Sequence, residues 1–190
     1  MLSDTSYTIE TTRLKLRLMQ GDDVDGMLGI FTDPNVMAAF SLTSFTRGQM
    51  QDWVQRNLDH QSKYGYGLFA VIHKASGRLI GDCGLEWEDV QGALLPELGY
   101  DFHSDYWRQG LATEAATAVR DYAFGKLALS RLVSLIRAGN EASRRVAEKV
   151  GMKLVNEFTT PRGIRYWLYG ISSPDSPQPR DTANQSQSEV

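Results

Sequence analysis

Alternating hydrophobic and polar positions predict most strands of this chain. From Thr12 to Leu18 a leucine stands at every second position, which is typical of a strand with one buried face. The same period of two, or a short apolar run between turn residues, predicts six further strands. They cover residues 68–73, 79–87, 95–102, 130–137, 152–158 and 164–169. The segments 74–78 and 159–163 have turn composition, so we expect two hairpins there.

Apolar residues at helical spacing predict four helices. The first follows Gly21 and ends before Pro34, which we interpret as a stop, and the second covers residues 46–62. The third begins at Gly110, and the fourth runs from an Asn140 cap to Gly151. The order is β-α-α-β-β-β-α-β-α-β-β, a mixed α/β fold, which argues against a purely parallel doubly wound sheet.

One folded domain, residues 1–171, accounts for all of these elements. Residues 172–190 contain three of the six prolines and two hydrophobic residues, so they bury too little apolar surface to offset the entropy of ordering. We predict that this C-terminal segment is a disordered tail.

Composition excludes several classes of function. The 20 Lys and Arg are scattered among 23 Asp and Glu, with a net charge of −3, which argues against a nucleic-acid-binding protein. No apolar run approaches the ~20 residues that span a membrane, so we expect a cytoplasmic protein without a membrane partner. The three histidines lack metal-ligand spacing, and we interpret the single cysteine, Cys83, as a buried apolar residue.

The clearest candidate site is the turn that leads into the helix at Gly110. Small residues, Gly110 and Ala112, leave the first backbone N–H groups of that helix uncovered, and such groups bind phosphate or pyrophosphate. Arg108 would add a charged contact. The alternative is a plain strand-to-helix turn in which Gly110 only relieves a steric clash.

Three segments together resemble the GNAT superfamily of N-acetyltransferases. They are residues 106–115 (YWRQGLATEA), 139–152 (GNEASRRVAEKVGM) and 10–17 (ETTRLKLR), and the resemblance extends over residues 8–169. It is greatest to the branch that acts on the N-terminal alanine or serine of ribosomal proteins. The resemblance implies a single-domain acyl-CoA N-acyltransferase fold, with a central, mostly antiparallel, splayed sheet of seven strands and about four helices.

This resemblance implies acetyl-CoA as co-substrate and no metal. In the family's pyrophosphate loop, Gly110 and Ala112 match, while Trp107 stands where Gln or Arg is usual. The backbone of the strand ending at Phe102 would pair with the pantetheine arm, and an N–H near Phe102 would stabilise the oxyanion. The implied cofactor-binding residues are Tyr100, Phe102, Trp107, Arg108, Gln109, Gly110, Leu111, Ala112, Thr113, Asn140 and Ser143.

The implied reaction is direct attack of an amine on the acetyl carbonyl. We predict Glu86 as the general base, with Glu88 or Asp89 as substitutes; the alternative is a solvated carboxylate at a strand end. Ser143 is the predicted acid that protonates the CoA thiolate, unless it is an ordinary residue of a first helical turn. An α-amine with a pKa of ~8 demands less deprotonation than a lysine amine at ~10.4.

The predicted function is therefore acetyl-CoA-dependent acetylation of a protein N-terminal α-amine by a monomer or homodimer. An acetyltransferase of a small-molecule amine, such as an antibiotic, a polyamine or an amino acid, is an alternative. A non-catalytic acetyl-CoA-binding module is another, and a third is a protein that binds a different nucleotide phosphate at the Gly110 turn. Binding of acetyl-CoA with and without turnover distinguishes them.

Overall fold

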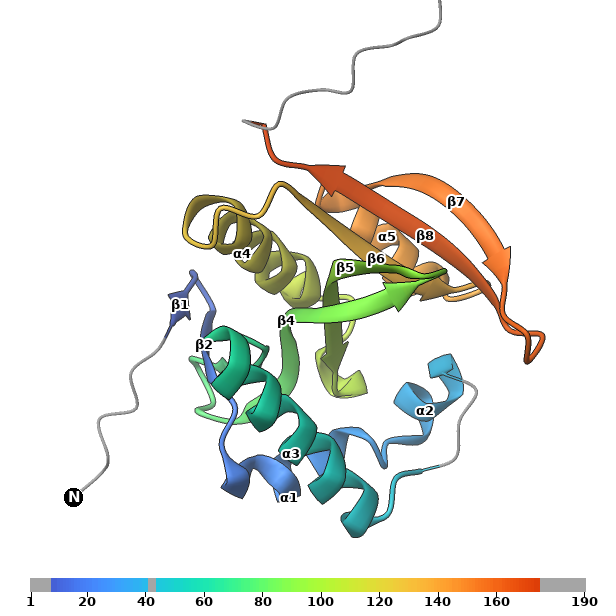
Figure 1. Ribbon diagram of the computed structural model, residues 1–190. Coiled ribbons are helices and arrows are strands. Elements are labelled where there is room, and N and C mark those ends of the chain that lie inside the picture. Colours follow the sequence, from blue (N-terminus) through green and yellow to red (C-terminus); the bar gives the residue numbers. More distant parts are fainter. Residues whose placement is uncertain (1–7, 41–43, 175–190) are drawn as a thin grey trace, which may run out of the picture.

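A single sheet organises the described part of the chain. The computed structural model describes residues 8–40 and 44–174 (Figure 1). Within them the strand order is β1-β2-β3-β4-β5-β6-β8-β7, and all neighbours are antiparallel except β5 and β6. The strands are β1 (Ile9–Glu10), β2 (Leu14–Leu18), β3 (Leu68–His73), β4 (Leu79–Val90), β5 (Ala93–Phe102), β6 (Arg131–Arg137), β7 (Lys153–Thr159) and β8 (Arg165–Ser172).

Helices cover both faces of this sheet (Figure 1). They are α1 (Val24–Ile30), α2 (Pro34–Phe40), α3 (Arg47–Tyr64), α4 (Leu111–Gly125) and α5 (Glu141–Lys149), with short 3₁₀ turns at η1 (Gly21–Asp23) and η2 (Ser104–Tyr106). One buried cluster joins α4 and α5 to β2–β6 and includes Phe69, Cys83 and Leu98. A second cluster joins α1, α2 and α3 to the opposite face through Leu68 and Ala70 of β3. The two faces of β3 and β4 therefore belong to different cores.

The mixed α/β fold is confirmed, with eight strands and five α-helices among the described residues where seven and about four were expected. The additional strand is β1, which is two residues long. The additional helix is α2, and here the interpretation of Pro34 was incomplete: α1 ends at Ile30, but Pro34 is itself the first residue of a new helix. Asp33 accepts a hydrogen bond from the Asn35 N–H at 2.9 Å, and proline suits the first helical position because its missing N–H is not needed there.

The β5–β6 junction positions the site. These parallel strands pair at Glu97 and Val133. Side chains then replace the ladder: Ser134 Oγ donates to the Leu98 carbonyl at 2.7 Å, and the Leu135 N–H donates to the Glu97 carboxylate at 2.9 Å. The strands diverge beyond this point, so the splay that the family resemblance predicts is present.

The last described strand reaches the start of the predicted C-terminal tail. β8 ends at Ser172, one residue inside the predicted tail, and the Ser173 N–H donates to the Ser130 carbonyl at 2.8 Å. The remainder of that tail, 175–190, falls outside the described residues. In the described ranges, no helix is long and apolar enough to cross a membrane, and no group of three His, Cys, Asp or Glu could hold a metal ion.

Candidate active site

The turn before α4 leaves the first backbone N–H groups of that helix without a side-chain cap. Arg108 and Gly110 have positive φ angles of 60° and 78°, and Gly110 is the N-cap residue, where glycine adopts this conformation without strain. No side chain caps α4, so the N–H groups of its first residues, Leu111, Ala112 and Thr113, are not used by a cap. Uncapped N–H groups at a helix start, together with the helix dipole, are the features that the predicted anion site requires.

Arg13 and Glu114 hold this turn from behind. Arg13 donates to the Gln109 carbonyl at 2.8 Å and to the Glu114 carboxylate at 2.7 Å, and Thr11 also donates to Glu114 at 2.6 Å. Burial opposes ionisation of Glu114, but the hydrogen bonds from Thr11 and Arg13 outweigh it and lower its pKa. The sequence analysis did not identify Arg13 or Glu114 as parts of the site, because residues 101 positions apart leave no spacing signal.

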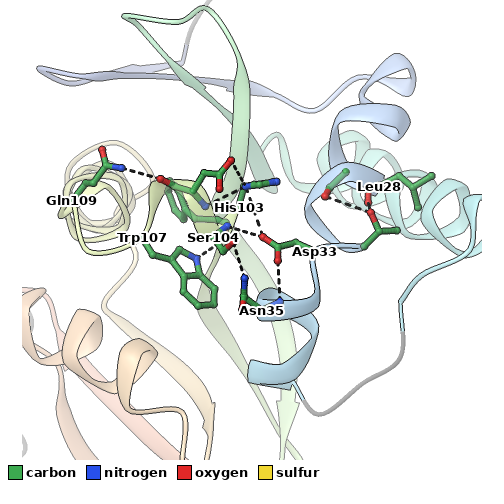
Figure 2. A network of polar contacts seen from close by, with 11 residues as sticks. Leu28, Asp33, Asn35, His103, Ser104, Trp107 and Gln109 are labelled. Carbon is green, nitrogen blue, oxygen red and sulfur yellow. Dashed lines mark hydrogen bonds and ion pairs between the residues drawn. The ribbon is translucent and has the colours of Figure 1, made fainter.

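Trp107 links the turn to the end of β5. Its indole N–H donates to the Phe102 carbonyl at 2.7 Å, as Figure 2 shows. The Phe102 carbonyl is thus occupied, which corrects the expectation that both backbone groups of Phe102 are free. Backbone groups of successive residues point to opposite edges of a strand, so alternate residues share an edge, and the Leu98 carbonyl faces β6. The N–H groups of Tyr100 and Phe102 therefore face the same edge, toward the diverging β6.

A polar network joins the α1–α2 turn to the residues after β5 (Figure 2). The buried Asp33 carboxylate accepts from the Ser104 N–H at 3.0 Å, and Asn35 Nδ2 donates to Ser104 Oγ at 3.2 Å. Burial opposes ionisation of Asp33, but the hydrogen bonds from Ser104 and Asn35 lower its pKa. His103 Nδ1 accepts from the Asp105 N–H at 3.2 Å, so His103 caps a turn. These contacts fix the α1–α2 turn, on one face of the sheet, to the residues after β5 that lead to α4 on the other face.

Ser143 and Tyr100 meet beside the diverging strands. Tyr100 donates its phenol to the Ser143 carbonyl at 2.8 Å, and Ser143 Oγ donates to the Tyr100 phenol oxygen at 3.2 Å. Burial raises the pKa of Tyr100, so the phenol stays protonated. Asn140 caps α5 by accepting from the Ser143 N–H at 3.1 Å, as predicted. The sequence indicated Tyr100 only for its backbone, and its side-chain contact with Ser143 was missed.

Glu86 lies among several other carboxylates. The register of the β4–β5 hairpin places Glu86 opposite Glu97 and Asp82 opposite Asp101, all on one face. We call these four residues the acidic face. Of the predicted substitutes, Glu88 is exposed at the rim, and Asp89 caps the hairpin turn by accepting from the Gly92 N–H at 2.7 Å.

Burial explains the electrostatics of the acidic face. It raises the pKa of Glu86, an effect increased by the charge of Glu88 and opposed by Arg56 of α3. It also raises the pKa values of Glu97 and Asp101 to about 7. Carboxyl groups poised near neutral pH are effective proton acceptors. Sequence reasoning found only Glu86, although acids inside otherwise apolar strands were a usable signal for the others.

Cys83 lies on the opposite face from these acids. It is fully buried in the cluster under α4, and burial raises its thiol pKa well above the ordinary value. A buried, protonated thiol is a poor nucleophile, in agreement with its interpretation as an apolar core residue.

Comparison with known proteins agrees with this geometry. The model of the acetyltransferase (GNAT) domain matches residues 13–153, which include the α4 turn, the acidic face and α5. The chain belongs to the GNAT acetyltransferase family. The uncharacterized protein YkkB of Bacillus subtilis is 36% identical over 158 residues, 81% of this chain and 91% of that protein.

Solved GNAT structures share the fold. A GNAT-family acetyltransferase from Bacillus anthracis superposes with a TM-score of 0.73 at 26% identity, covering 87% of this chain and 98% of that one. RimL, a ribosomal L7/L12 α-N-protein acetyltransferase solved with coenzyme A, superposes with a TM-score of 0.71 at 16% identity, covering 88% and 98%. This GNAT protein is therefore an N-acetyltransferase with a mixed α/β acyltransferase fold.

Proposed function

We propose that this GNAT protein transfers the acetyl group of acetyl-CoA to a primary amine by direct attack in a ternary complex, and that the amine is the N-terminal α-amine of a protein. The observation that carries the proposal is the uncapped start of α4 beside the diverging β5 and β6. An anion site and a free strand edge lie side by side, which suits a ligand with a pyrophosphate and a peptide-like arm.

Each part of acetyl-CoA has a proposed partner. The pyrophosphate binds the N–H groups of Gly110, Leu111, Ala112 and Thr113, with the exposed Arg108 and Gln109 at its edge. Trp107 acts by bracing the turn, since its indole N–H is bonded to Phe102. The pantetheine arm extends along β5 and hydrogen-bonds the Tyr100 N–H. The Phe102 N–H is the oxyanion donor, and Asn140 lies where the arm passes the start of α5.

Two side chains take part in the proposed proton transfers. Glu86 accepts a proton from the ammonium form of the acceptor, directly or through water, and the neutral amine attacks the acetyl carbonyl. The C–N bond forms as the C–S bond breaks, and the nitrogen releases its second proton to water. Ser143 donates a proton to the departing thiolate and regains one from water, while its contact with the Tyr100 phenol holds the hydroxyl in place. No acyl-enzyme is formed, which agrees with the buried position of Cys83.

Two observations support an N-terminal amine as acceptor. Its pKa of ~8 lies close to the raised carboxyl pKa values of about 7 at Glu97 and Asp101, so proton transfer is only slightly uphill. RimL, which shares the fold, is a protein α-N-acetyltransferase. A small-molecule amine is the second candidate, because the same acidic face would attract a compact cation.

Calorimetric titration of acetyl-CoA into the wild type and Gly110→Trp tests the cofactor assignment. Gly110 has a positive φ, and the indole would cover the N–H groups of α4, so we expect wild-type binding and at least a tenfold loss in the variant. Gly77→Trp is the matched control, since Gly77 also has a positive φ with open space around it but lies in the β3–β4 turn. Thermal melts of both variants establish that they fold.

The acceptor is tested by CoA-thiol release with an alanine-led peptide amide and with its Nα-blocked form. We expect release with the free peptide alone. Acetyl-CoA binding without release to any amine would favour the non-catalytic module, and no acetyl-CoA binding by the wild type would refute the proposed function.

A further inference from the structure

Asp82 is the least expected residue of the acidic face. It is fully buried, and neither carboxylate oxygen has a hydrogen-bond partner among the described residues. Leaving a buried polar group unpaired costs about 1–3 kcal/mol, more if it is charged, and an apolar residue would avoid that cost. Packing alone therefore gives no reason for an aspartate here.

The β4–β5 register places the four acids together, and they differ in solvent exposure. Asp82 is buried behind Asp101, its cross-strand partner, while Asp101, Glu86 and Glu97 are partly exposed. Burial and the charges of Asp101 and Glu86 raise the pKa of Asp82. The other charged groups that act on this face are Glu88 at its rim and Arg56 of α3. One cation thus faces several carboxyl groups.

Gly99 leaves the centre of the acidic face without a β5 side chain. It stands between Glu97 and Asp101 on β5, and a Cβ there would make only ordinary van der Waals contact, 3.7 Å from Leu68 Cδ2. The fold would accept a side chain at this position, yet β5 has none. The two pairs of acids are therefore not separated by a side chain of the hairpin.

The acidic face is separate from the predicted CoA contacts but adjoins the same strand. Asp82 pairs with Ala70 of β3, which belongs to the core under α1, α2 and α3, whereas α4 packs on the opposite face. Glu97 also begins the divergence of β5 from β6 through its bond to the Leu135 N–H. A ligand on this face would reach the diverging strands from the side opposite α4.

We propose that the acidic face binds the acceptor amine in its ammonium form, with the three partly exposed carboxylates against the cation and Asp82 behind them as a positioning residue. This inference rests on the proposed function and deepens it, because it defines the acceptor as a primary amine that arrives charged. Asp82 and Asp101 share this end of the face, and Arg56 is the one cation of the described chain that acts on its carboxyl groups, so a bound ammonium adds compensating positive charge.

The carboxylates of the acidic face also accept the proton that the acceptor ammonium must lose before the amine can attack. One ammonium proton moves to a carboxylate of the face, giving a neutral amine and a carboxylic acid, and the amine then attacks the acetyl carbonyl. The product amide is neutral, so the face no longer holds it. The carboxylic acid returns its proton to water after the amide leaves, which restores the charge for the next acceptor.

Binding of n-butylammonium and n-butanol to the CoA complex tests this proposal without turnover. The two probes have the same length and differ in charge. We expect n-butylammonium to bind at least tenfold more tightly and to shift backbone amide signals near residues 82–86 and 97–101 in ¹H–¹⁵N spectra. In Asp82→Asn and in Asp101→Asn, the preference should fall to roughly twofold or less. Glu10→Gln removes an exposed acid of the edge strand β1 that pairs with Lys74, and it should keep the preference.

The pH profile of peptide acetylation separates positioning by Asp82 from a structural role. Two carboxyl groups that share a site titrate as a pair, so Asp82→Asn should move the acidic limb of kcat/KM to lower pH. A folded Asp82→Asn variant with an unchanged limb and an unchanged probe preference would overturn the proposal. If Asp82→Asn does not fold, Asp101→Asn decides by the same probe ratio.

These outcomes are distinct from failure of the proposed function. A wild type that acetylates the alanine-led peptide but binds n-butanol as tightly as n-butylammonium refutes the ammonium site alone. A wild type that shows the probe preference but acetylates no peptide refutes the N-terminal acceptor and keeps the site. Loss of acetyl-CoA binding in the wild type refutes the function itself.

Discussion

At the scale of single residues, the contact between Tyr100 and Ser143 changes the interpretation of both side chains. Ser143 as an isolated first-turn serine has a hydroxyl pKa far too high for a useful acid. Its hydroxyl donates to the Tyr100 phenol oxygen at 3.2 Å, and this contact orients the hydroxyl beside the diverging strands. The two residues come from α5 and β5, so the pair exists only in the folded chain.

Ser143→Ala should lower kcat by about 10–100-fold, because the departing thiolate loses its proton donor. Tyr100→Phe should lower it less, and it should lower the free energy of unfolding by about 1 kcal/mol through the lost buried hydrogen bond. Acetyl-CoA affinity should change by no more than about threefold in either. Stopped-flow thiol release and calorimetry measure these effects.

Ser76→Ala is the control for that pair, since Ser76 is exposed in the β3–β4 turn and contacts His73. Unchanged kcat in a folded Ser143→Ala variant would remove Ser143 from the proposed chemistry.

At the scale of elements, the start of α4 depends on the β1–β2 turn. Arg13 bonds to Gln109, the residue before Gly110, and to Glu114 in the first turn of α4. These bonds hold the chain on both sides of Gly110. Their ends are partly exposed, so the ion pair adds little to stability. Its effect is geometric, because it limits the turn to the conformation that points its N–H groups outward.

Arg13→Ala should therefore weaken acetyl-CoA binding by about 3–10-fold while lowering the free energy of unfolding by no more than about 1 kcal/mol. Calorimetry and urea unfolding measure the two quantities. Arg47→Ala, which breaks the exposed ion pair with Asp25, is the matched control and should change neither. If both arginine variants bind acetyl-CoA like the wild type, the bonds of Arg13 to Gln109 and Glu114 are not required for the binding conformation of the turn.

At the scale of the whole molecule, the acidic face should make stability depend on pH. The pKa values of Glu97 and Asp101 are raised to about 7 in the folded state from ordinary values of 4.5 and 3.8. Between these limits the folded chain binds more protons than the unfolded chain. Its stabilising contribution is therefore present at low pH and is lost as pH rises toward 7.

We expect the free energy of unfolding to fall by on the order of 2 kcal/mol between about pH 5 and about pH 8 from these groups. The double variant Asp82→Asn/Asp101→Asn should flatten this decrease, and Glu10→Gln, in the exposed ion pair with Lys74, should leave it intact. Urea unfolding across that range measures the slope. An equal slope in the wild type and the double variant would contradict the assigned pKa values. Higher stability of the double variant at pH 8, combined with lost activity, would identify the acids as a functional cost to the fold.

Much of the fold was predictable because its signals are local. Leucine alternation near Leu16, the Asn140 cap and the turn at Gly110 each act within a few residues, and all are present in the structure. Pro34 shows the limit of such signals. A proline can end a helix or begin one; here α1 already ends at Ile30, Pro34 begins α2, and Asp33 accepts from the Asn35 N–H at its start.

The sequence by itself determined the alternating strands, the capped helices and the glycine turn at the start of α4, because period, caps and backbone conformation depend on neighbours along the chain. Tertiary structure alone decided which side chains share the site. Asp82 meets Asp101 only through the hairpin register, Tyr100 meets Ser143 across 43 residues, and Arg13 meets Glu114 across 101. Burial of the acids, and with it their raised pKa, likewise depends on the layers that cover them. Desolvation arises from packing, which no local pattern records.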